Sequence, residues 1–229
     1  MGWIDQYRGS KDLPQRLPVF PLQGAILLPR ATLPLNVFEP RYLEMVKDVL
    51  KESRVLGIIQ PKQFNNQVVE IESPSGKKVA LRAIGCVGRI TSFQEIEDGR
   101  LGITLTGIAR FDVVKEIDTE LPYRILDVLY DRFPNDFSTA YGEDKVDRSN
   151  LLRVLKAYLK QNRLQADWAA IERASSETLI NALCVMAPYG TEEKQALLEA
   201  PDLKSRAEVL IALAEMEIET SGSSGNTIQ

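Results

Sequence analysis

The spacing of apolar and polar positions changes part-way along the chain. In the first part, short apolar runs such as LPVFPLQ (17–23) and VLGIIQP (55–61) are separated by prolines, glycines and polar loops, which is typical of short strands. From about residue 136 onward, apolar residues recur at helical spacing. The pattern therefore predicts an α+β fold, with a β-rich lobe over 17–135 and a helical lobe over 136–219.

Local signals place several elements within the β-rich lobe. Prolines interrupt the apolar runs at 17–23 and 33–38, so we expect both runs to be edge strands, where a missing N–H group is tolerated. Pro40 suits the first turn of the one helix expected in this lobe. Asp98-Gly99 lies between two β-rich runs and predicts a hairpin.

The helical lobe has its own start and stop signals. The run LINALCVM (179–186) is apolar on nearly all sides and predicts a buried central helix. Thr191 and Asp202 can each cap the N-terminus of a helix, and the second of these helices is expected to end near Glu219. Residues 220–229 have the composition of a flexible tail, and we expect them to be dispensable for folding.

The composition is that of a soluble globular protein. The chain has 229 residues, 44% of them hydrophobic and 26% charged. It has no run of the roughly 18 apolar residues that a membrane helix needs, and the polar arm at 1–16 lacks the apolar region of a secretion signal. We therefore expect a cytoplasmic protein without membrane contact. Cys86 and Cys184 form no C-x-x-C pair and are expected to be small buried side chains.

The sequence lacks most of the residues on which enzymes rely. It contains no histidine, which removes the commonest general base and the commonest metal ligand. Gly76-Lys77-Lys78 lacks the upstream glycine and the following hydroxyl of a phosphate-binding loop, and there is no G-x-S-x-G motif. We predict no catalytic site, no cofactor and no metal. A hydrolase that uses a serine or a carboxylate is the least favoured alternative.

The stretch LPLNVFEPRYLEMVKDVL joins an extended run directly to a helix and allows two interpretations. In the first it is a structural corner, where Pro40 sets the first helical turn, Phe38 and Tyr42 pack beside it, and Glu39 and Arg41 form a partly solvated pair. In the second, Phe38, Arg41 and Tyr42 line a polypeptide-binding rim. We favour the corner, and therefore expect Phe38 to be buried and its truncation to unfold the β-rich lobe.

A basic stripe is predicted on one helix of the second lobe. Helical spacing over 149–163 projects Arg153, Lys156, Lys160 and Arg163 away from the apolar side. Such a stripe can grip phosphates or an acidic polypeptide, or can simply be a solvated face. Because the formal net charge of the chain is −4, the solvated face is favoured and nucleic acid is not the expected partner.

Several blocks, in order, resemble a known family. LPVFPLQGAILLPRATLPLNVFEPRYLEMV is similar to the opening of the N-terminal domain of Lon proteases in its stand-alone bacterial form, and GIIQP, GCVGRITS and EDGRLGITLTGIARF resemble its following strands. LINALCVMAPYGTEEKQALLEAPDLKSRAEVLIALAE is similar to the helical end of the same group. The resemblance implies a PUA-like pseudo-barrel followed by a helical bundle. It also implies a role in binding protein substrates.

The resemblance does not extend to the ATPase and protease modules of full-length Lon. We therefore expect a non-catalytic module that captures exposed or unfolded polypeptide segments and passes them to a protease or a chaperone. The main alternative is an RNA-binding protein, because PUA-like folds often bind RNA and the predicted stripe is basic. The identity of the client, the binding surface and the oligomeric state stay open at this point.

Overall fold

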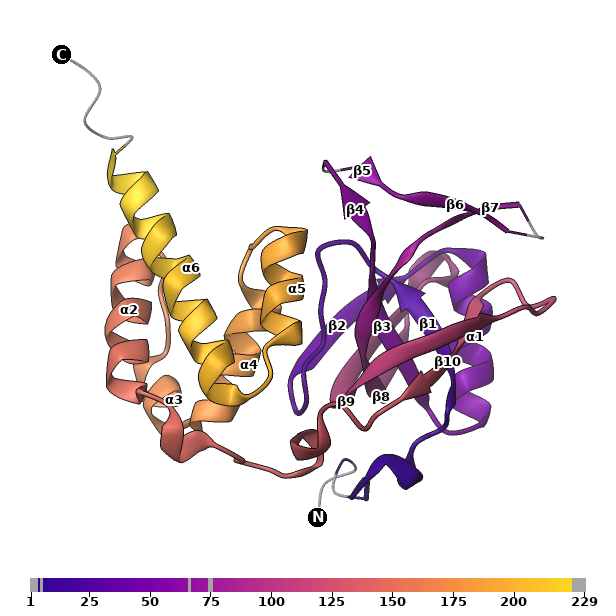
Figure 1. Cartoon of the computed structure of the whole chain (residues 1–229), viewed down its shortest axis with the longest axis horizontal. Coiled ribbons are helices and arrows are strands. Elements are labelled where there is room, and N and C mark those ends of the chain that lie inside the picture. The colour runs from indigo at the N-terminus through magenta and orange to yellow at the C-terminus, as the bar shows by residue number, and fades with distance from the viewer. Residues whose placement is uncertain (1–3, 5, 66, 74–75, 224–229) are drawn as a thin grey trace.

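The strands and the helices occupy successive parts of the chain. The structure is a computed structural model that describes residue 4 and residues 6–65, 67–73 and 76–223. Figure 1 shows α2–α6 on one side of the strands and α1 (Pro40–Lys51) on the other. The strands are β1 (Arg16–Pro21), β2 (Thr32–Val37), β3 (Val55–Pro61), β4 (Gln63–Phe64), β5 (Gln67–Val68), β6 (Glu70–Ser73), β7 (Gly76–Val79), β8 (Leu81–Glu95), β9 (Leu101–Ile117) and β10 (Arg124–Leu129).

Five strands form a closed ring. The main sheet has the order β10-β1-β3-β8-β9-β2, and β10 also pairs with β9. The sheet therefore closes on itself, and β2 lies outside the ring, where it pairs with β9. β1 and β3 are parallel, whereas the other neighbours are antiparallel. The long strand β9 pairs with β2 over 101–106 and with β10 over 112–117. Two small hairpins, β4–β5 and β6–β7, project between β3 and β8.

The interior of the ring is filled by one apolar cluster around Phe111, which is completely buried. Two glycines make room for the Phe111 side chain. A Cβ atom at Gly85 would lie 2.5 Å from Phe111 Cζ, and a Cβ atom at Gly57 would lie 3.0 Å from Phe111 Cε1. A second cluster on the outside of the ring includes Tyr42 and Met45 of α1. The ring is therefore packed on both of its surfaces.

The loop before β2 crosses the ring at a glycine. Gly107 N donates to Ala31 O at 2.9 Å, and Arg30 N donates to Gly107 O at 2.8 Å. A Cβ atom at Gly107 would lie only 2.0 Å from the carbonyl oxygen of Leu28. No other residue type fits this crossing without movement of the backbone.

Three of the local predictions for the strands can be compared with the structure. The Asp98-Gly99 hairpin is confirmed, since β8 and β9 pair antiparallel around it and Asp98 has a φ of 68°. β2 is an edge strand as expected. The same prediction for β1 is wrong, because β1 pairs with β10 and β3. Its prolines are accommodated because the two pairings overlap only at Val19, so Pro18 and Pro21 each face one partner.

The helices that follow are α2 (Arg148–Gln161), α3 (Trp168–Arg173), α4 (Ser176–Met186), α5 (Thr191–Glu199) and α6 (Leu203–Ser223). Asp202 caps α6 as predicted, since its Oδ1 accepts from Ser205 N at 2.8 Å. The predicted cap at Thr191 is wrong, because Gly190 is the N-cap and Thr191 is the first helical residue. α6 also continues beyond Glu219, so the predicted flexible tail begins too early; residues 224–229 lie outside the described part.

Buried polar groups join the ring to the helices. Arg110 of β9 donates to both carboxylate oxygens of Asp136, at 2.7 and 2.9 Å, and to the carbonyl oxygen of Leu198 at 3.0 Å. From the helical side, Gln195 donates to Ile84 O at 3.2 Å. Hydrogen bonds are directional and are costly to break when buried. These contacts therefore fix the orientation of the helices on the ring.

Candidate functional site

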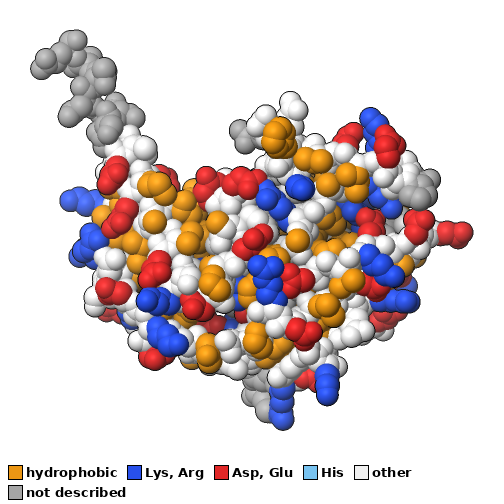
Figure 2. Space-filling view, viewed as in Figure 1, with side chains coloured by type: hydrophobic (Ala, Val, Ile, Leu, Met, Phe, Trp, Pro, Cys, Tyr) orange, Lys and Arg blue, Asp and Glu red, His pale blue; other side chains and the backbone are white. Residues whose placement is uncertain are grey.

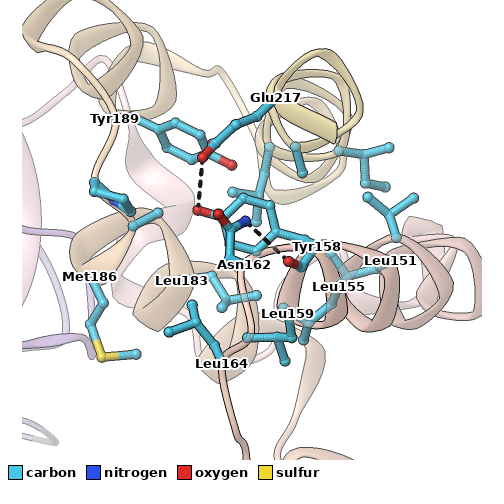
Figure 3. A pocket seen from close by; sticks show the side chains of 16 residues that line it. Leu151, Leu155, Tyr158, Leu159, Asn162, Leu164, Leu183, Met186, Tyr189 and Glu217 are labelled. Atoms are coloured by element: carbon cyan, nitrogen blue, oxygen red, sulfur yellow. Dashed lines mark hydrogen bonds between the residues drawn. The ribbon is translucent and has the colours of Figure 1, made fainter. Parts of the chain in front are cut away.

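An apolar groove lies in the helical part. It is bounded by α2, by α6 and by the end of α4 with the segment that follows it, and its volume is about 400 Å³. Leucines and a methionine dominate its walls, and the side chains in Figure 3 point from these three elements toward a common space. In the whole molecule, apolar side chains are visible between the upper half of α6 and α5 (Figure 2). A concave apolar surface with a few polar groups is the usual form of a binding site.

The end of α2 forms one wall of the groove. After Gln161 the chain closes the helix with paired hydrogen bonds, from Leu164 N to Leu159 O at 2.9 Å and from Arg163 N to Lys160 O at 3.3 Å. Arg163 has a φ of 54° and takes the left-handed position that glycine usually occupies in this motif. The turn brings Leu164 back beside Leu159, and Leu164 remains 54% exposed.

The end of α4 forms the opposite wall. Ile180 and Cys184 are completely buried, as the apolar run predicted, but the expectation of a buried helix fails at its end, where Met186 is 71% exposed. The helix stops because Pro188 follows directly after the C-cap residue Ala187. Unbranched methionine side chains adapt readily to ligands of different shape.

The polar side chains that line the groove are those of Tyr158, Asn162, Tyr189 and Glu217. Tyr158 of α2 donates its hydroxyl hydrogen to Glu217 Oε1 of α6 at 3.4 Å (Figure 3). Burial raises the pKa of the Tyr158 phenol, and the charge of Glu217 and its hydrogen bond add to the increase. Burial likewise raises the pKa of Tyr189, which follows α4. Both phenols are therefore protonated at neutral pH, and Glu217 carries the charge of the groove.

The cysteine thiols are poor nucleophiles. Cys86 and Cys184 are both free and buried, which confirms the sequence-based expectation. Burial raises the pKa of Cys184 to about 12 and also raises that of Cys86, so thiolate is scarce at neutral pH. Among the described residues, no three His, Cys, Asp or Glu side chains gather as a metal site would require, and no helix is long and apolar enough to cross a membrane.

At the predicted corner, the two aromatic side chains behave differently. Tyr42 is buried and stacks on Phe20, with ring centroids 4.0 Å apart. Phe38 is 64% exposed, so the prediction that it packs in the corner is wrong. The side chain of Val37, the last residue of β2, points into the core. Because successive side chains of an extended chain point to opposite sides, Phe38 points outward. Arg41 pairs with Glu39 at 2.7 Å and lies 4.5 Å from the centre of the Tyr42 ring.

The predicted basic stripe is interrupted. Arg153 pairs with Glu215 of α6 at 3.0 Å, and Lys156 lies 6.0 Å from the centre of the Trp168 ring. α2 ends at Gln161, so Arg163 lies beyond the helix and does not continue its regular spacing. Lys160 is exposed on the outer face of α2. The four cations therefore do not form one continuous helical stripe.

Comparison with known proteins places this architecture in a family. A family model described as the substrate-binding domain of ATP-dependent protease La (LON) matches residues 16–215. The chain belongs to the LON substrate-binding domain family. This confirms the resemblance seen in the ordered sequence blocks, and the match includes both the strand ring and all of the walls of the groove except Glu217.

The similar curated proteins are much longer than this chain. It is 29% identical to Lon protease 2 of Myxococcus xanthus over 209 residues, which are 89% of this chain and 24% of that protein. It is 26% identical to the Lon protease of Anaeromyxobacter dehalogenans, over 89% of this chain and 23% of that protein. The chain thus spans about a quarter of the length of these relatives, and the similarity concerns one part of them.

Solved structures support the fold of this LON domain. A Lon N-terminal domain protein from Xanthomonas campestris aligns with a TM-score of 0.58 and 24% identity, over 86% of this chain and 97% of that one. The N-terminal domain of a Mycobacterium avium complex Lon protease aligns with a TM-score of 0.60 and 15% identity, over 87% and 98% of the two chains. The mixed sheet followed by helices is therefore the Lon N-terminal domain fold.

Proposed function

We propose that this LON domain is a non-catalytic module that binds exposed apolar or unfolded polypeptide segments in the groove between α2, α4 and α6. The exposed apolar walls carry the proposal, because Leu164 and Met186 face solvent at the mouth of the groove. Exposed apolar surface of this kind is typical of interaction sites, and amphipathic segments commonly dock in such grooves. In a cytoplasmic setting, the bound segment would pass to a protease or a chaperone.

In this proposal the two lobes have separate roles. Residues 17–135 form a PUA-like pseudo-barrel that supports the helical lobe at 136–219, and the buried contacts of Arg110 support such an arrangement. The corner is a second candidate contact surface. Its exposed Phe38 and the neighbouring Arg41 are residue types that anchor peptides at interfaces.

A peptide-binding titration with groove variants tests the proposal. The ligand is a fluorescein-labelled peptide of twelve leucines, alanines and serines with one central lysine, and binding is followed by fluorescence anisotropy. Met186→Ser and Leu164→Ser should each weaken binding about tenfold, as loss of an interface anchor does. The melting temperature should hardly change, because both side chains are more than half exposed.

Met216→Ser is the matched control. Met216 is 54% exposed and lies on α6 but does not line the groove, so this change should leave the affinity for the peptide unaltered. Equal affinities for the wild type and both groove variants would refute the groove as the binding site. Phe38→Ser and Arg41→Ala, measured in the same titration, would then show whether the peptide binds at the corner.

RNA binding is tested in parallel with a labelled single-stranded RNA. We expect no salt-dependent binding, since Arg153 is already paired with Glu215 and the chain is net acidic. A strong decrease of affinity with added salt would favour the RNA-binding alternative. We also expect no turnover of ATP, peptides or esters by the purified chain, which assays on these three substrate classes check directly.

A further inference from the structure

Among the described residues that line the groove, Glu217 is the only charged one. Its carboxylate lies beside the hydroxyl of Tyr158 and the ring of Tyr189 (Figure 3). Tyr158 supplies one hydrogen bond, at the long distance of 3.4 Å. A carboxylate oxygen accepts, so the Tyr158 hydroxyl is the donor, and this hydrogen bond holds the carboxylate toward the groove.

No cation of the described chain neutralises Glu217. Two other glutamates of α6 have such partners: Glu215 pairs with Arg153 at 3.0 Å, and Glu208 pairs with Lys204 at 3.7 Å. For Glu217 no lysine or arginine of the described residues comes within 4.0 Å of the carboxylate. The acceptor capacity of a carboxylate is about four hydrogen bonds, so most of it is left for water or for a ligand.

A ligand in the groove changes the environment of this carboxylate. An apolar segment that covers Glu217 removes water from it, and a desolvated carboxylate without a partner is strongly unfavourable. A ligand that brings a lysine or arginine replaces the lost water with an ion pair, and the adjacent tyrosine rings also attract cations. A ligand with an aspartate or glutamate at the same place is repelled.

We propose that Glu217, flanked by Tyr158 and Tyr189, receives a basic side chain of the bound polypeptide, so that the groove selects apolar segments that carry a lysine or arginine. The inference rests on the proposed function and specifies its substrate class. It follows from charge complementarity between the carboxylate and the ligand. Selection arises both from the attraction of the correct ligand and from the penalty for the wrong one.

Three labelled peptides test this selection. They share the leucine, alanine and serine sequence described above and differ only in the central residue, which is lysine, norleucine or glutamate. For the wild type we expect the lysine peptide to bind about tenfold more tightly than the norleucine peptide, and the glutamate peptide to bind most weakly. In Glu217→Gln the lysine and norleucine peptides should bind within about twofold of each other.

Two further variants make the result specific to this position. Glu215→Gln removes a neighbouring charge of the same helix outside the groove and should keep the preference for lysine. Glu217→Lys should reverse the order and favour the glutamate peptide. Melting temperatures of all three variants should match the wild type, because Glu217 and Glu215 are both partly exposed.

The outcomes separate this inference from the proposed function. Equal binding of the lysine and norleucine peptides to the wild type, or a preference that survives in Glu217→Gln, would overturn the inference while leaving polypeptide binding intact. Absence of binding by all three peptides would overturn both. A preference that Glu215→Gln abolishes as well would show a general effect of net charge and would also refute a specific role of Glu217.

Discussion

The strand ring and the helical part differ in how completely they bury their apolar side chains. In the ring, each strand has two neighbours and the interior is filled around Phe111, which is fully buried. In the helical part, α2 and α4 do not close against each other, and Leu164 and Met186 remain more than half exposed at their ends. The comparison indicates that the ring provides rigidity, whereas the helices provide a surface that is available to a ligand.

If that division is correct, changes in the ring should reduce stability and changes in the groove should reduce binding. The largest loss of stability is expected for Gly107→Ala. The added carbon would lie 2.0 Å from Leu28 O, and because this atom belongs to the backbone, the crossing loop must move. We expect a loss of at least about 3 kcal/mol in the free energy of unfolding, measured by urea denaturation.

The control for Gly107→Ala is Gly9→Ala. A Cβ atom at Gly9 has nothing within 4 Å, and the residue has an extended backbone with a φ of −173°. This variant should unfold within about 0.5 kcal/mol of the wild type. Equal stability of the two variants would mean that the loop that crosses β9 can move at little cost in free energy. The ring would then not be the more rigid of the two parts.

Arg110→Met tests the contact between the halves. The change removes the guanidinium hydrogen bonds to the Asp136 carboxylate and to the Leu198 carbonyl, and leaves that carboxylate only the backbone N–H of residue 110 as a donor. We therefore expect a loss of about 3 kcal/mol, at the lower end for a broken buried pair. Arg132→Met is the matched control, since Arg132 makes an exposed pair with Asp112 at 3.2 Å and should contribute about 1 kcal/mol or less. Similar losses for both would show that the halves are not held by this network.

The corner supplies a smaller test within one segment. Tyr42→Ala removes a buried ring that stacks on Phe20 and should cost about 3 kcal/mol. Phe38→Ala removes an exposed ring and should change stability by about 0.5 kcal/mol or less. Thermal denaturation of the two variants decides the matter, and a large loss for Phe38→Ala would show that this ring packs after all.

The smallest effect is expected for the cap of α6. Asp202→Ala should cost about 1 kcal/mol. The backbone N–H of Ser205 lowers the pKa of Asp202, so the contribution is present above the ordinary carboxyl pKa and is lost as the pH falls through the lowered value. Denaturation curves at pH 7 and pH 3 should therefore show a difference from the wild type that shrinks in acid. Asp202→Asn should retain most of the stability at both pH values, because asparagine still offers a capping oxygen.

Local chemistry made part of this fold predictable. The Asp98-Gly99 hairpin, the helix that begins at Pro40 and the cap at Asp202 each depend on a few neighbouring residues, and the structure confirms them. The place of β1 between β3 and β10 depends on residues far away in the sequence. For the same reason, the prolines of β1 were misleading as a sign of an edge strand.

The candidate groove was beyond local reasoning. The run at 179–186 is apolar throughout, and its sequence does not reveal that the helical neighbours leave Met186 uncovered. Leu164 is exposed because Arg163 adopts the left-handed conformation, for which glycine or asparagine would have been the usual signal. Tyr189 and Glu217 come from different elements, and only the tertiary structure brings them together.

The closure of the ring also determines the order in which the protein can be assembled. β1 is the first strand of the ring to be synthesised and β10 is the last, yet residues 16–19 pair directly with residues 124–127. Contacts between such distant segments form slowly. While the chain emerges from the ribosome, β1 and β9 both keep an unpaired edge until β10 arrives. During its own synthesis, this domain therefore passes through a stage in which it exposes unpaired strand edges of the kind that chaperones recognise.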